Sequence, residues 1–169
     1  MTDRDASTTD GRPHSEANWL ARSRTASQWS GALFGIGAAA FVDEVVFHQL
    51  LHWHHFYDKS TSDVGLVSDG LLHAFGWFAV VSSLFWLAAL RARRALNWRV
   101  WAGGALLGGG LFQLYDGTVQ HKLMRLHQIR YEVDITPYDL AWNVIAAMLI
   151  FAGIMLLFVR PGSPATRDA

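Results

Sequence analysis

Four long runs of apolar residues limit most strongly what this chain can fold into. They cover about residues 29–51, 70–90, 100–123 and 138–159. A helix of roughly 20 such residues crosses the hydrocarbon core of a bilayer, which is about 30 Å thick. Only 17% of the 169 residues are charged, whereas soluble domains are about a quarter charged. We therefore expect an all-α integral membrane protein with four transmembrane helices.

The segments outside these runs divide the chain into one membrane domain and two tails. We expect the four-helix membrane domain over residues 28–160. The segment 1–27 is rich in Ser, Thr, Asp and Arg and is predicted to be a disordered cytoplasmic tail. A second, short cytoplasmic tail is expected at 161–169.

The positions of Lys and Arg predict the orientation in the membrane, because these residues accumulate in cytoplasmic loops. On the side of both termini lie Arg4, Arg12, Arg22, Arg24, Arg91, Arg93, Arg94, Arg99, Arg160 and Arg167. On the other side lie Lys59, Lys122, Arg125 and Arg130. We therefore expect a multi-pass plasma-membrane protein with both termini in the cytoplasm and with the loops at 52–68 and 124–136 facing outward.

Composition also excludes several classes of function. The 14 basic residues are balanced by 14 acidic ones, which argues against a nucleic-acid partner, since such proteins carry clustered positive charge. The chain has no cysteine, so thiolate metal sites, iron–sulfur clusters and disulfides are absent. Any chemistry must therefore use His, Asp, Glu or a bound cofactor.

The third apolar run repeats the first at an offset of 73 residues. Gly31-Ala32-Leu33 aligns with Gly104-Ala105-Leu106. The aligned polar pairs are Asp43 with Asp116, His48 with His121, and His54 with His127. A weaker match at an offset of 70 pairs Asp69 with Asp139 and His73 with Asn143. This pattern predicts two parallel two-helix repeats that pack as a four-helix bundle, with glycines allowing the first and third helices to approach closely.

Most of the ionisable residues in these runs gather at the outward end of the predicted bundle. An ionised Asp within hydrocarbon costs at least about 2.5 kcal/mol, so these side chains need partners inside the protein. We expect a metal ion to be that partner, because imidazoles and carboxylates are its common ligands. The candidate metal residues are Asp43, Glu44, His48, His52, His55, Asp69, His73, Asp116 and His121.

Helix spacing refines these roles. His48, His52 and His55 would lie on one stripe of an ideal helix. Asp43 and His48 are five residues apart, which corresponds to a rotation of about 140°, so one metal would bind both only across a distorted turn. Asp43 and Asp116 are therefore open to a supporting role beside the imidazoles of a neighbouring helix. Taken singly, His14, His54 and His127 are weaker candidates.

The whole membrane region resembles a family of small bacterial integral membrane proteins known as domain of unknown function 2243. The resemblance rests on Phe41–His55, Ser68–His73 and Tyr115–Lys122, and it extends over roughly residues 29 to 160. It implies a bacterial inner-membrane protein that has these His and Asp motifs in common with the family. It implies no activity.

Three functions are compatible with these residues. The first is a metalloprotein with one or two ions of iron, copper or zinc, acting as a redox enzyme on oxygen or a lipophilic substrate, with zinc-type hydrolysis as a variant. The second is capture or delivery of copper, although only Met124 offers a soft ligand near the cluster. The third is a b-type haem protein with His48 and His121 or His73 as axial ligands, although the glycines lie too deep to admit the porphyrin there. Lipid is the expected partner, and a homo-oligomer remains open.

Overall fold

The structure is a computed structural model that describes residues 12–159, and this range contains helices and loops but no strand. The first part of the expected N-terminal tail and the expected tail at 161–169 lie outside the described residues. The helical elements are α1 (Arg12–Asp43), η1 (Glu44–Leu50), α2 (Ser62–Ala92), α3 (Trp98–Tyr115), η2 (Asp116–Leu123) and α4 (Thr136–Phe158). The elements η1 and η2 are π-helical continuations of α1 and α3.

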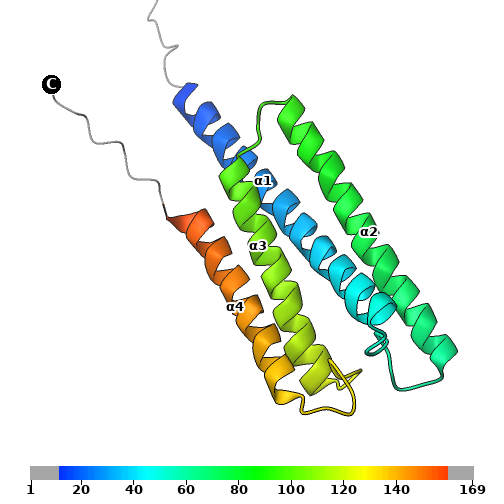
Figure 1. The fold of residues 1–169 in the computed structure, drawn as a ribbon. Coiled ribbons are helices and arrows are strands. Elements are labelled where there is room, and N and C mark those ends of the chain that lie inside the picture. The colour runs from blue at the N-terminus through cyan, green and yellow to red at the C-terminus, as the bar shows by residue number, and fades with distance from the viewer. Residues whose placement is uncertain (1–11, 160–169) are drawn as a thin grey trace, which may run out of the picture.

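The four long helices pack side by side, with α1 and α3 at the centre (Figure 1). Helix α2 packs on α1, and α4 packs on α3, so that α2 and α4 lie on opposite flanks. Within the described residues these two flanking helices do not contact each other. The loops at 51–61 and 124–135 lie together at one end of the molecule, and both chain ends emerge at the other (Figure 1).

Three of the helical segments are long and apolar enough to cross a membrane. They are Glu16–Leu50, Ser62–Ala92 and Thr136–Phe158. Helix α3 is not among them, because its five glycines together with Arg99 and Gln113 lower its hydropathy. Large apolar side chains such as Phe85 and Phe151 are exposed on the flanking helices, as expected of a surface that faces lipid.

Two helix boundaries differ from those expected from the sequence. Helix α1 begins at Arg12, so residues 12–27 are helical rather than disordered. Good helix formers (Glu, Ala, Leu and Arg) recur through this segment, and its last residue is anchored, since Ser27 Oγ accepts a hydrogen bond of 3.0 Å from the Asn97 amide. Helix α2 begins at Ser62, well before residue 70, after the N-cap residue Thr61. The other predicted ends agree closely with the structure.

Glycines bring the two central helices together, as the repeated Gly-rich segments predict. A Cβ atom on Gly35 would overlap the carbonyl oxygen of Ala105 in α3. A Cβ atom on Gly108 would overlap the carbonyl oxygen of Ala32 in α1. The α1–α3 crossing is therefore a backbone-to-backbone contact that leaves no space for a side chain at either position.

Candidate metal centre

The two π-helical segments bring each Asp close to the His that follows it five residues later. A π-helix closes i→i+5 rather than i→i+4 hydrogen bonds, so residues five apart come onto one face. His121 Nε2 lies 3.1 Å from Asp116 Oδ2, and His48 Nε2 lies 3.9 Å from Asp43 Oδ2. The distorted turn that an ideal helix lacks is therefore part of this fold, and it places both Asp residues directly beside imidazoles.

Two further imidazoles come from the loops, and each contacts a backbone carbonyl group of the opposite loop. His54 Nδ1 lies 2.9 Å from the carbonyl oxygen of Ile129. His127 Nδ1 lies 2.8 Å from the carbonyl oxygen of Phe56. A carbonyl oxygen only accepts hydrogen bonds, so each Nδ1 carries the proton and donates it. Each neutral ring therefore presents the lone pair of its Nε2 atom, which is the form that binds metals.

Burial keeps both loop imidazoles neutral. Burial, reinforced by the neighbouring imidazoles of His127, His48 and His121, lowers the pKa of His54 to about 2. Burial lowers the pKa of His127 to about 4, against the opposing effect of the Asp116 carboxylate. Both side chains are therefore free of the second proton near neutral pH.

The two loop imidazoles form a compact group with His121. The ligand nitrogens of His54, His121 and His127 all lie within 4.8 Å of one another. His121 Nε2 is 2.9 Å from His127 Nε2, and Asp116 Oδ1 is 3.7 Å from the same His127 atom. Tetrahedral zinc with bonds of about 2.0–2.1 Å holds its ligand atoms roughly 3.3 Å apart, so this group can hold a metal ion.

A second compact group lies on the α2 side of the first and contains two carboxylates. Glu44, His48 and Asp69 also have ligand atoms within 4.8 Å of one another, and all three are buried. The His48 ring lies 4.5 Å from the His54 ring, measured between centroids. The two groups are thus neighbours in one buried layer.

Several buried polar atoms in this layer have no hydrogen-bond partner. They are Glu44 Oε2, His48 Nε2, His54 Nε2, Asp116 Oδ2 and His121 Nδ1. A buried polar group without a hydrogen bond destabilises a fold, and a bound ion or water would supply the missing partners. Such a concentration of unpaired ligand atoms fits a site that a cation completes.

The structure gathers most, but not all, of the residues singled out in the sequence. Brought together in the buried layer are Asp43, Glu44, His48, Asp69, Asp116 and His121. His55 is partly buried and reaches the layer's edge, with its Nδ1 atom 2.6 Å from Asp69 Oδ2. The other two lie outside: His52 and His73 are both exposed.

The expected stripe of His48, His52 and His55 does not form, because the helix ends at Leu50. His52 then adopts a left-handed conformation with φ of 52°, and the residue is exposed. His73 is exposed on α2, and its ring lies 5.0 Å from that of Phe41 in α1, outside the layer.

His54 and His127 are weaker candidates in the sequence than in the structure. Both are loop residues, and sequence periodicity does not predict where a loop places its side chains. The signal that points to them is their alignment with each other at the end of the shared Asp-x4-His-x5-His pattern.

Two pockets adjoin the layer. One, of about 410 Å³, lies among polar residues and is lined by His121 and His127 together with Lys122, Arg125 and Tyr131. The other, of about 190 Å³, is lined mainly by apolar side chains such as Phe47 and Phe112, and it reaches Asp43. The layer is therefore approached by a polar route from the loop end and by an apolar route between the helices.

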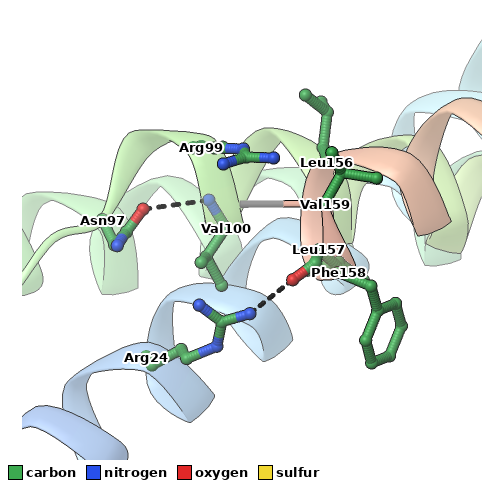
Figure 2. A pocket seen from close by; sticks show the side chains of 8 residues that line it. All are labelled: Arg24, Asn97, Arg99, Val100, Leu156, Leu157, Phe158 and Val159. Carbon is green, nitrogen blue, oxygen red and sulfur yellow. Dashed lines mark hydrogen bonds between the residues drawn. The ribbon is translucent and has the colours of Figure 1, made fainter. Parts of the chain in front are cut away.

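A third pocket, of about 610 Å³, lies at the opposite end of the molecule, between α1, the start of α3 and the end of α4 (Figure 2). There Arg24 donates a hydrogen bond to the carbonyl oxygen of Leu157, and the Asn97 side chain accepts one of 3.1 Å from the Val100 amide (Figure 2). Neither an imidazole nor a carboxylate is among the described residues that line it. It takes no part in the candidate metal centre.

Comparison with known proteins agrees with this picture of a helical membrane protein. Neither the curated proteins nor the solved structures give a significant match to the chain. The sequence does match the family described as "Predicted membrane protein (DUF2243)" over residues 30–160, which include all of the buried His and Asp residues described above. The chain therefore belongs to this family of predicted membrane proteins.

Proposed function

We propose that this membrane protein is a metalloprotein in which His54, His121, His127 and Asp116 hold an ion of iron, copper or zinc. One observation carries the proposal: backbone carbonyls take the Nδ1 protons of His54 and His127, so each ring keeps the lone pair of its Nε2 atom, and both rings lie in one compact group with His121. Ligating histidines in metalloproteins are commonly oriented by such a bond at the other ring nitrogen. Three imidazoles and one carboxylate suit all three metals.

The activity that best fits the surroundings of the site is a redox reaction with oxygen or a lipophilic substrate. The apolar pocket of about 190 Å³ extends from between the helices to Asp43, so a lipophilic molecule can approach from the bilayer. The polar pocket beside His121 and His127 gives water and small solutes a separate path. A bound iron or copper ion supplies the electron-transfer chemistry, while the buried protein groups fix its ligands and limit access of water.

The two alternative functions receive less support from the geometry. Delivery of copper requires ligands that a partner can reach, whereas His54, His121 and His127 are all buried. A haem needs a slot between its axial ligands, which would be His48 and His121 or His73. The ring of His54 lies 4.5 Å from that of His48 and 6.2 Å from that of His121, and His73 is exposed outside the layer.

The proposed arrangement has four spans, with α3 as the third, in a membrane domain over residues 28–160. The contacts of α3 support this: it lies between α1 and α4, both of which are candidate spans, and packs along each. Arg24 and Arg99 line the pocket at the end of the molecule where both chain ends lie (Figure 2). Basic residues at this end agree with a cytoplasmic location of the chain ends.

Reciprocal contacts support an origin from two repeats at the offset of 73. The bond from His54 to Ile129 has its counterpart in the bond from His127 to Phe56. The contact of Gly35 with Ala105 is likewise matched by that of Gly108 with Ala32. In each pair, adding 73 to the residue number from the first half gives the corresponding residue of the second half. Such an exchange is expected if a twofold axis relates the halves.

The proposed orientation predicts which positions an impermeant thiol reagent reaches in intact cells. The chain has no cysteine, so single cysteines report without background. Ser62 begins α2 at the loop end, and Ala95 lies between α2 and α3 at the other end. A cysteine at Ser62 should be labelled from outside and one at Ala95 only after the cells are permeabilised. The reverse pattern would overturn the orientation.

Elemental analysis of the protein purified in mild detergent tests the proposed metal centre. We expect at least one tightly bound iron, copper or zinc ion per chain. Iron or copper supports the redox reaction, and zinc shifts the choice to hydrolysis. A Soret band in the absorption spectrum would instead identify haem. Protein that stays free of metal after incubation with each ion would reduce the layer to a structural hydrogen-bond network or a proton relay.

A further inference from the structure

Four buried carboxylates lie in the layer, and the described residues place no Lys or Arg nitrogen within 4.0 Å of any of them. They belong to Asp43, Glu44, Asp69 and Asp116, each at most 5% exposed. Buried ionised carboxylates require a compensating charge, and their cost is far larger than that of a neutral polar group. A bound cation is therefore a suitable partner for the carboxylates of this layer.

Two of the four carboxylates lie beside His48. Its Nδ1 atom lies 2.8 Å from Glu44 Oε2 and 3.1 Å from Asp69 Oδ1. One nitrogen cannot satisfy two carboxylates well, and Glu44 Oε2 is left buried without a hydrogen bond. The other oxygens are held in place: Gln49 donates to Glu44 Oε1 at 2.7 Å, and His55 Nδ1 lies 2.6 Å from Asp69 Oδ2.

We propose that Glu44, His48 and Asp69 form a second metal site, so that the layer is a dinuclear centre. The proposal rests on the proposed function for its neighbour, the imidazole site. The second site has two carboxylates and one imidazole, so it prefers a harder ion such as iron(II), manganese or zinc, whereas the first is rich in imidazole.

The two halves of the chain differ where this second site lies, so it is not a by-product of the repeat. Gly117 stands at the position that corresponds to Glu44. Asp139 corresponds to Asp69, but it is paired with Lys122 at 3.2 Å and is partly exposed. The second half therefore keeps one carboxylate and pairs it with Lys122, whereas among the described residues neither Glu44 nor Asp69 has such a cation.

Zinc titration of metal-stripped full-length protein in detergent tests this proposal. We expect about two zinc ions per wild-type chain and about one in Asp69→Asn, since loss of a charged ligand removes a site of this kind. The control is Asp139→Asn, the corresponding change in the other half, which should keep both ions. Glu44→Gln is the second variant, in case Asp69→Asn does not fold, and it should also bind about one ion.

The outcomes separate the two proposals. One zinc per wild-type chain, unchanged in Asp69→Asn and Glu44→Gln but lost in His127→Ala, overturns the second site and leaves the proposed function standing. No zinc in wild type overturns both. Two zinc ions in wild type that Asp69→Asn and Glu44→Gln both retain would also overturn the assignment of these residues.

Discussion

Replacing His121 with alanine should weaken metal binding by more than a hundredfold while the helices stay folded. His121 Nε2 lies at the centre of the imidazole group, 2.9 Å from His127 Nε2 and 3.1 Å from Asp116 Oδ2. Loss of a residue that only supports a ligand already costs about 10–100-fold in affinity, so loss of a ligand costs more. Competition with a chelator of known affinity measures the change, and circular dichroism checks the helices.

His73→Ala is the matched control for this experiment. His73 is also a histidine near the end of a helix, but its side chain is exposed and packs beside Phe41 rather than in the layer. This variant should bind metal with wild-type affinity. Equal affinity in the His121 and wild-type proteins would remove His121 from the site.

Gly35→Leu should prevent the central helices from packing and so abolish the folded protein. A Cβ atom at Gly35 would overlap the Ala105 carbonyl oxygen and lie 2.8 Å from the Gly109 amide nitrogen. These are backbone atoms, which cannot rotate aside, so the cost exceeds the 1–3 kcal/mol typical of an overpacked core. Thermal unfolding and size-exclusion chromatography in detergent measure the result. The imidazole site should be lost as well, because the segments that follow α1 and α3 supply its residues: His54 follows η1, and Asp116 and His121 belong to η2.

Gly70→Leu provides the control, since a Cβ atom at Gly70 meets no other atom within 4 Å. The change should alter stability by less than about 0.5 kcal/mol, as surface substitutions usually do. If Gly35→Leu behaves like Gly70→Leu, the central helices do not approach as closely as the structure has them.

The sequence predicts the helices of this fold well because their signal is continuous and local. Apolar runs of about 20 residues locate the ends of most helices, and the aligned glycines predict the contact between the first and third. The start of α1 at Arg12 is not predicted, because composition alone does not reveal that Ser27 meets Asn97. Such a contact depends on the packing of distant segments.

The candidate site is predicted in outline, and its misses have one physical cause. The buried layer contains His48 and His121, as expected, but the stripe through His52 assumes that the helix continues, and it ends at Leu50. The π-helical turns place Asp116 beside His121, where ideal helix geometry keeps them apart. His54 and His127 depend on carbonyl groups of the opposite loop. Local irregularities and contacts between loops are the features that periodicity does not encode.

X-ray absorption at the edge of the bound metal shows whether imidazoles hold the ion, because it reports which atoms surround it. The imidazole site predicts nitrogen or oxygen neighbours at about 2.0–2.1 Å, together with the outer-sphere scattering of histidine rings. In a His54→Ala, His127→Ala double variant, the scattering from histidine rings should decrease together with the amount of bound metal. A bound ion whose spectrum has no imidazole contribution would contradict the assignment of the metal to His54, His121 and His127.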